Sequence, residues 1–176
     1  MDTLKSIFER RSIRKYKRDV AVSDEQIENI LKAGFSAPSA HGGSPWEFIV
    51  IDDRDIIEKL SNAKIYYKKP LTDAPLAIAI LIDKDKNSEN IKLEYKFQDC
   101  SAAMENMLIA ATAQGLGTCW MGGLLNENDM ATVIDILKIP QNRLFFGVVS
   151  VGEPDEKKEA HGVIEKSKVH YNQYNG

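Results

Sequence analysis

The chain has 176 residues, of which 43% are hydrophobic and 28% are charged, and its formal net charge at pH 7 is -3. This composition is typical of globular proteins, and the length predicts a single domain over residues 1–176 with one sizeable core. The apolar stretches are too short or too interrupted to span a bilayer, and the first residues lack the apolar core of a secretion signal, so we expect a cytoplasmic protein with no membrane partner.

Helical and strand patterns follow one another in mixed order. Helices are expected at residues 3–11, 24–37, 54–61, 93–114 and 127–138, and strands at 48–51, 76–82, 118–121 and 144–152. Ser23 and Gln26 form a capping box before the second helix, and Asn126 is expected to cap the last one. The first two strands are continuous apolar runs, which is typical of central strands covered on both faces.

Two stretches are expected to lie outside the core. Residues 84–90 are strongly polar and predict a solvent-exposed loop. Residues 153–176 form a polar tail, which we expect to be an arm that could embrace a partner chain. Cys100 and Cys119 belong to no Cys-x-x-Cys pair, which argues against a disulfide or a zinc site, and each is expected to be a small buried hydrophobe.

Basic residues gather near the N-terminus. Residues 1–18 hold seven Lys and Arg against two acidic residues, and the rest of the chain is acidic. The cluster is short and the remainder would repel a nucleic-acid backbone, so a single anionic ligand fits better. Arg10, Arg11, Ser12 and Arg14 could bind a phosphate through guanidinium, hydroxyl and backbone N–H groups. The same cations could instead stabilise the negative end of the first helix dipole.

Glycines and tryptophans leave two interpretations open. Gly122-Gly123 could let a backbone approach a flat ligand, or could form a plain turn after a strand. Neither a Walker A loop nor a dinucleotide-binding G-x-G-x-x-G motif is present in this region. Trp46 and Trp120 could be core residues or cofactor platforms, and their indole N–H groups need partners if they are buried.

Short segments spread along nearly the whole chain carry a family resemblance. They read RRSIRKY from Arg10, APS from Ala37, PWEF from Pro45, DAP from Asp73, GLGTCW from Gly115 and VGEP from Val151. In this order they resemble the FMN-dependent nitroreductase family. The resemblance implies an α+β fold with a mixed β-sheet flanked by helices. It also implies an intertwined homodimer with two FMN molecules at the subunit interface.

The resemblance assigns roles to particular residues. Those expected to bind FMN are Arg10, Arg11, Ser12 and Arg14 at the phosphate and ribityl chain, Pro38, Ser39 and Ala40 from the other subunit, and Met121, Gly122 and Gly123 by backbone approach to the ring. A basic residue after the Gly-x-Pro turn completes the phosphate site, with Lys158 or Lys157 as the candidate. His41 lies at a position that faces the substrate in relatives.

The chain also departs from the family pattern. Gly42 and Ser44 stand where Asn and Gln are common, so we expect a wider pocket and a main-chain contact, at Gly42, in place of the missing amide. The basic residue often found before the Asp-Ala-Pro strand is displaced, which leaves Lys68 or Lys69 as substitutes.

The implied activity is electron transfer from NADH or NADPH to a nitroaromatic, a quinone or a similar small acceptor by a ping-pong mechanism. In this interpretation FMN performs the electron transfer, so no catalytic side chain and no metal are required. Two alternatives remain. One is a flavin-dependent reductive dehalogenase of the same fold, whose lid would have to fit into residues 62–73. The other is a flavin-binding protein without turnover.

Overall fold

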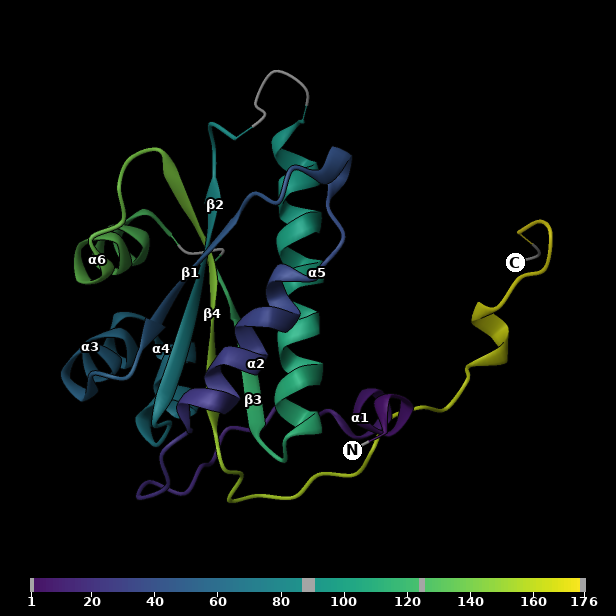
Figure 1. The fold of residues 1–176 in the computed structure, drawn as a ribbon, viewed down its shortest axis with the longest axis horizontal. Coiled ribbons are helices and arrows are strands. Elements are labelled where there is room, and N and C mark those ends of the chain that lie inside the picture. Colours follow the sequence, from purple (N-terminus) through teal and green to yellow (C-terminus); the bar gives the residue numbers. More distant parts are fainter. Residues whose placement is uncertain (1, 87–90, 124–125, 175–176) are drawn as a thin grey trace.

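Four strands form one sheet at the centre of the molecule (Figure 1). The computed structural model describes residues 2–86, 91–123 and 126–174. The strand order is β1 (Trp46–Ile51), β2 (Leu76–Asp83), β4 (Arg143–Gly152) and β3 (Gly117–Gly122). All three neighbouring pairs are antiparallel. The α+β fold is confirmed, but the expected mixture of strand directions is limited, in the described part of the chain, to a parallel bridge between Ser12 and Thr118.

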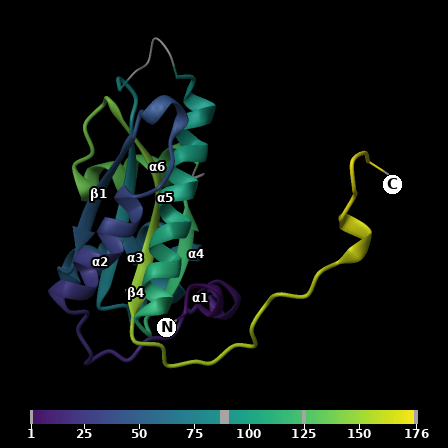
Figure 2. The ribbon, with the colours of Figure 1, turned by 45° about the vertical axis from the view of Figure 1, so that its right-hand side comes forward.

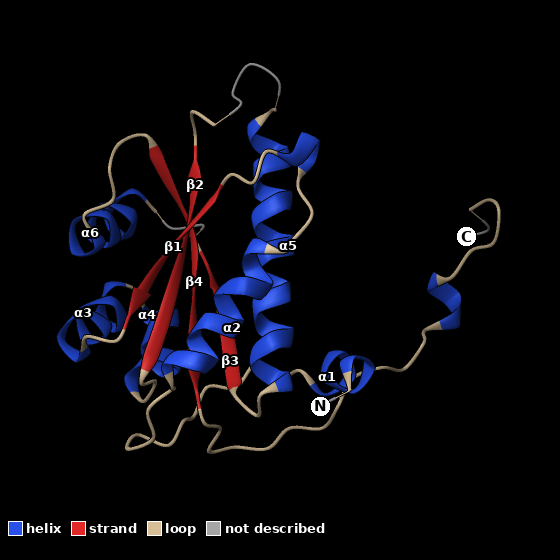
Figure 3. Cartoon of the chain, viewed as in Figure 1, coloured by secondary structure: helices blue, strands red, loops and turns tan. Residues whose placement is uncertain are grey.

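Helices cover both faces of the sheet (Figure 3). One face carries α2 (Asp24–Phe35) and the long α5 (Leu93–Ala113), and the other carries α3 (Arg54–Ala63), α4 (Ile65–Thr72) and α6 (Glu127–Leu137). The short α1 (Thr3–Glu9) contacts α5. The sequence did not predict α4, because it contains Pro70 and two lysines and lacks a clear apolar stripe.

The strand β2 separates the two halves of the core. Its even-numbered residues, from Leu76 to Ile82, pack with α5, whereas Ala77, Ala79 and Leu81 pack on the opposite face. The prediction of a central strand is therefore correct for β2. It is wrong for β1, which is an edge strand of this sheet with Val50 39% exposed. An apolar run alone does not tell an edge strand from a central one.

The two predicted helix caps are confirmed, whereas the predicted end of the first helix is wrong. The capping box is confirmed, since Ser23 Oγ accepts the Gln26 N–H and the Gln26 side chain accepts the Ser23 N–H. Asn126 caps α6 as expected by accepting the Asp129 N–H. The first helix ends at Glu9, two residues earlier than predicted. Of the predicted loop 84–90, residues 84–86 form a turn, and 87–90 lie outside the described residues.

The C-terminal arm, residues 153–174, leaves the sheet after β4. It runs past α1 and then extends away from the rest of the chain, with a short 3₁₀ turn, η2 (Lys166–Lys168), along it (Figure 2). Its apolar side chains Val163, Ile164 and Tyr171 are largely exposed. None of the helices in the described part of the chain combines the length and apolar character needed to cross a membrane.

Candidate functional site

Residues 10–17, called the arginine segment below, are fixed to the start of β3 by backbone bonds. Ser12 bridges Thr118, and the Ile13 N–H donates to the Thr118 carbonyl at 2.8 Å. The buried Tyr16 hydroxyl donates to the Ile13 carbonyl at 2.6 Å and lies 2.7 Å from Ser150 Oγ on β4. Burial raises the pKa of Tyr16 well above its usual range, so this hydroxyl keeps its proton.

The start of the C-terminal arm pairs with the other side of the arginine segment. The Lys17 N–H donates to the Glu153 carbonyl at 3.0 Å, and the Asp155 N–H donates to the Lys15 carbonyl at 2.9 Å. Between these bonds, Tyr16 and Pro154 form an antiparallel bridge. This pairing joins the two ends of the sequence and carries the next residues of the arm, including Lys158, back to Ser12.

Two cations converge on the carbonyl oxygen of Ser12. It accepts a hydrogen bond from Arg14 Nη1 at 3.4 Å and another from Lys158 Nζ. The nearby Glu156 carboxylate accepts the Arg14 N–H at 2.5 Å and lies 3.3 Å from Lys158 Nζ. Burial alone would raise the pKa of Glu156, but the Arg14 N–H and the Lys158 charge outweigh it and hold the pKa below its usual range. Glu156 thus pairs with the Lys158 cation and with the Arg14 backbone, while the Arg14 guanidinium bonds to the Ser12 carbonyl, so the cluster of Arg14, Lys158 and Glu156 keeps a net positive charge.

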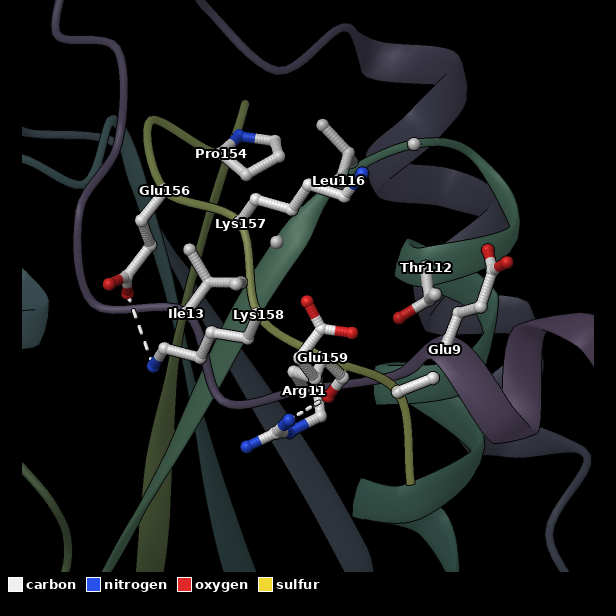
Figure 4. A pocket seen from close by; sticks show the side chains of 13 residues that line it. Glu9, Arg11, Ile13, Thr112, Leu116, Pro154, Glu156, Lys157, Lys158 and Glu159 are labelled. Atoms are coloured by element: carbon white, nitrogen blue, oxygen red, sulfur yellow. Dashed lines mark hydrogen bonds and ion pairs between the residues drawn. The ribbon is translucent and has the colours of Figure 1, made fainter. Parts of the chain in front are cut away.

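Arg10 and Arg11 do not join this cluster. Arg10 Nε pairs with Glu105 Oε1 of α5 at 3.1 Å. Arg11 Nη1 donates to the Glu159 carbonyl and lines a cavity of about 460 Å³ beside Thr112 and Lys158 (Figure 4). The predicted phosphate residues therefore separate into a convergent group, Ser12 with Arg14 and Lys158, and two arginines that point elsewhere.

The end of β3 carries the predicted glycine pair. A Cβ at Gly123 would lie 2.6 Å from the Phe146 carbonyl oxygen, so glycine is required there by packing alone. At Gly122 a Cβ would meet no atom of the described residues within 4 Å. The Gly122 carbonyl accepts the Tyr67 hydroxyl at 2.9 Å, and the Met121 side chain is buried in the core. The interpretation as a plain turn therefore accounts for Gly123. It does not account for Gly122, where the space that a Cβ would occupy is empty in the described part of the chain.

The strand β3 runs from the cation cluster, formed by Arg14, Lys158 and Glu156 around the Ser12 carbonyl, to the open space at Gly122. Thr118, which bridges Ser12, and Gly122 are four residues apart on one strand, a distance of about 13 Å. The strand alternation places both on the same face. An extended ligand with an anionic end could therefore contact both groups at once.

The second predicted region, called loop 39–44 below, lies at the opposite end of α5. It contains the 3₁₀ turn η1 (Ala40–Gly42), in which His41 and Gly42 are exposed. The Ala40 N–H donates to Asp99 Oδ1 at 2.9 Å, and the Ser44 N–H donates to Ser39 Oγ at 3.0 Å. The preceding Pro38 is also exposed.

Within one chain, loop 39–44 and the cation cluster are far apart (Figure 1). Asp99 contacts the loop near the start of α5, and Thr112 lies by the arginine segment near its end, about 20 Å along the helix. A single chain therefore does not bring the two predicted groups together.

Sequence reasoning missed Asp99, Tyr67 and Glu156. Asp99 had a detectable signal, because it falls on the same helical stripe as the buried Ala103 and Met107. Glu156 had none, because its partners come from the other end of the sequence.

Of the remaining candidate groups, the two cysteines and Trp46 are buried, whereas Trp120 on β3 is 37% exposed. Cys100 and Cys119 are buried free thiols, as predicted, and burial together with the Asp99 charge raises the pKa of Cys100 to about 12. Trp46 is a core residue whose indole N–H has no hydrogen-bond partner in the described structure. Within residues 2–86, 91–123 and 126–174, His, Cys, Asp and Glu side chains form no group able to hold a metal ion.

Comparisons with known proteins give the family of this chain. The model of the Nitroreductase family matches residues 7–66 and 62–153. A protein of Archaeoglobus fulgidus, provisionally named an NADH dehydrogenase/NAD(P)H nitroreductase, is 42% identical over 158 residues, which cover 90% of this chain and 88% of the relative.

Two solved structures share the fold. An FMN-dependent nitroreductase from Clostridium difficile R20291 aligns with a TM-score of 0.85 and 35% identity, covering 97% of this chain and 99% of its own. The NADPH:FMN oxidoreductase of Vibrio harveyi in complex with NAD+ aligns with a TM-score of 0.85 and 26% identity, covering 99% of this chain and 78% of its own. Because the family model spans most of the sequence and the archaeal relative covers nearly all of it, this chain is a member of the nitroreductase family.

Proposed function

We propose that this protein is an FMN-dependent oxidoreductase that passes electrons from NADH or NADPH to nitroaromatic, quinone or similar acceptors in a ping-pong reaction. The observation that carries the proposal is the convergence of Arg14 and Lys158 on the Ser12 carbonyl. Two cations that donate to the same carbonyl oxygen suit a phosphate group, which can accept several charge-assisted hydrogen bonds. The names of the relatives, which include FMN and NAD(P)H, support the same choice.

The residues present fit FMN at both of its ends. Arg14, Lys158 and the hydroxyl of Ser12 would hold the phosphate, whereas Arg10 would have to leave its ion pair with Glu105 to lie beside the ribityl chain. The backbone from Met121 to Gly123 would face the ring, with the space above Gly122 left open by the missing Cβ. When bound, FMN supplies the redox chemistry by taking two electrons from the nicotinamide and giving them to the acceptor. The chain itself holds the cofactor and leaves room for the two substrates.

A second copy of the chain would complete the site. Loop 39–44 lies about 20 Å along α5 from the arginine segment, so we propose a homodimer in which this loop reaches the cofactor of the other subunit. Exposed apolar side chains on α1, among them Leu4 and Phe8, and on the arm, among them Val163 and Tyr171, support burial against a partner. In this arrangement His41 would face the substrate, and Gly42 would contribute a main-chain contact.

The test begins with the purified protein. The proposal expects a yellow protein that bleaches anaerobically with NADH or NADPH and regains its colour when a nitroaromatic or a quinone is added. Light scattering on a gel-filtration column should give the mass of a dimer. A coloured protein that does not bleach would be a flavin-binding protein without turnover, and a colourless protein that takes up no FMN would overturn the proposal.

Neighbouring lysines provide a matched test of the phosphate site. Lys158→Ala removes a cation from the cluster and should weaken FMN binding by about tenfold or more, the effect expected for a charge-assisted hydrogen bond. Lys157→Ala removes the same charge from the adjacent residue, and it should leave the dissociation constant within about twofold because exposed charges contribute little. Equal effects in the two variants would show that only net charge matters.

A further inference from the structure

Asp99 is a buried carboxylate that the proposed reaction does not use. It lies on α5 with 6% of its surface exposed. Its Oδ1 accepts the Ala40 N–H at 2.9 Å, and its Oδ2 is buried with no hydrogen-bond partner among the described residues. Burying a carboxylate without a cation is unfavourable. The contact with Ala40 is therefore the interaction that distinguishes Asp99 from the apolar residues of the same stripe.

The turn that Asp99 contacts has an unusual backbone. His41 and Ser44 have φ values of 51° and 43°, and Gly42 between them has 66°. Residues other than glycine are strained in this region by about 1 kcal/mol each, so such a turn persists only where surrounding contacts hold it. Inside the turn, the Gly42 N–H donates to the Ser39 carbonyl and the Gly43 N–H to the Ala40 carbonyl. The Ala40 N–H bond to Asp99 ties this internally bonded turn to the helix.

The chemistry of the loop makes its backbone geometry important. With Gly42 and Ser44 in place of longer amides, the loop can offer a ligand mainly main-chain atoms, the short Ser39 and Ser44 hydroxyls and the exposed His41 ring. Main-chain groups can be aimed only by fixing the backbone, whereas a long side chain can adjust by rotation. A rigid support for the loop is therefore needed in this chain.

We propose that Asp99 is a positioning residue that fixes loop 39–44 for contact with the FMN and the substrate of the partner subunit. This inference rests on the proposed function. Asp99 acts through Ala40, and through it sets the direction of the His41 side chain and of the Gly42 peptide groups. It does not touch the reacting atoms.

The experiment compares three variants with the wild type. Asp99→Ala removes the acceptor, and Asp99→Asn keeps an oxygen able to accept the Ala40 N–H. Asn106→Ala is the matched control, because it removes another hydrogen bond between an α5 side chain and the backbone, in which the Asn106 amide donates to the Ala33 carbonyl at 3.1 Å, without touching the loop. Amide hydrogen exchange of residues 40–44 in the FMN-free protein, the dissociation constant for FMN and the melting temperature are measured for each.

The proposal expects a specific pattern. In Asp99→Ala, exchange at Ala40 and Ser44 should rise about tenfold and FMN should bind about tenfold more weakly, as the loss of one buried hydrogen bond predicts. Asp99→Asn should restore both to within about threefold of the wild type. Asn106→Ala should lower the melting temperature while leaving loop exchange and FMN affinity unchanged.

Several results would overturn the proposal. Unchanged exchange in Asp99→Ala would show that the carboxylate does not hold the loop. An equal rise in Asn106→Ala would show a general loosening of α5, and faster exchange with unchanged FMN affinity would remove the link to the cofactor. If Asp99→Ala does not fold, Asp99→Ser replaces it, because a serine hydroxyl can bond back along the helix as Ser101 does to the Phe97 carbonyl. If the wild type binds no FMN, the proposed function fails, and the exchange data still decide whether Asp99 holds the loop.

Discussion

The arginine segment and loop 39–44 are held in place by different means. The arginine segment is bonded through its backbone to β3 on one side and to the C-terminal arm on the other, with the buried Tyr16 hydroxyl beneath it. Loop 39–44 has three positive φ values and is tied to α5 through the side chain of Asp99. The first region is bonded to the sheet, and among the described residues the hydrogen bond that links the second region to α5 is the one to Asp99. Substitutions in the first should therefore change stability most, and those in the second should change binding more than stability.

The largest effect is expected for Gly117→Ala. The added Cβ would lie 2.9 Å from Ile13 Cβ, so the arginine segment would have to move off β3. Overpacking of this kind lowers the free energy of unfolding by about 1 to 3 kcal/mol, and we expect a value near the upper end with weaker FMN binding. Urea denaturation and FMN titration measure the two effects.

The control for Gly117→Ala is Gly122→Ala on the same strand. A Cβ there has no atom of the described residues within 4 Å, so stability should change by less than about 0.5 kcal/mol. If the two variants were equally stable, the arginine segment would not be packed on β3 as described.

Tyr16→Phe should have the next largest effect. Removing the hydroxyl leaves the Ile13 carbonyl and the Ser150 hydroxyl without this partner, which should cost about 1 to 3 kcal/mol of unfolding free energy. Tyr67→Phe is the comparison, because it removes a single bond, to the Gly122 carbonyl, and should cost about 1 kcal/mol. A larger loss in Tyr67→Phe than in Tyr16→Phe would contradict the role given to Tyr16.

Only part of the arginine segment's setting could be predicted from the sequence. The RRSIRKY segment pointed to a phosphate site where the first helix ends, but its pairing with β3, which brings Ser12 to Thr118, was not predicted because contacts between distant segments leave no local pattern. The resemblance named Arg14 and either Lys158 or Lys157, but the choice between the two lysines could not be made from the sequence, since Lys158 reaches Ser12 through pairing between residues 15–17 and 153–155. Asp99 was visible in principle, as a charged residue on an apolar helical stripe, but its partner Ala40 was not. The edge position of β1 depends on sheet order, which an apolar run does not encode.

In loop 39–44, the variant Gly42→Ala should distinguish an effect on FMN binding from an effect on folding stability. Gly42 has a φ of 66° and open space around it, so alanine should cost only the conformational strain, about 1 kcal/mol. Gly115→Ala is the matched control, with a φ of 80°, equally open space and a position at the other end of α5. Both variants should lose similar stability in urea denaturation, and only Gly42→Ala should weaken FMN binding. Equal FMN affinity in the two variants would remove loop 39–44 from the binding site.

The smallest effect is expected at Glu156, and it should depend on pH. Glu156 has its pKa held below the usual value by the Arg14 N–H and Lys158, so its charge stabilises the folded state at neutral pH. That contribution is fully present above the unfolded-state pKa of about 4.3 and is lost as the pH falls through the lower folded-state pKa. Glu156→Gln keeps an acceptor for the Arg14 N–H but removes the charge, and its side chain is partly exposed, so at pH 7 it should cost no more than about 1 kcal/mol. Urea denaturation from pH 7 to pH 3 should show the difference between wild type and Glu156→Gln shrinking below about pH 4. A difference that stays constant over this range would mean that the carboxylate charge does not stabilise the junction between the arginine segment and the arm.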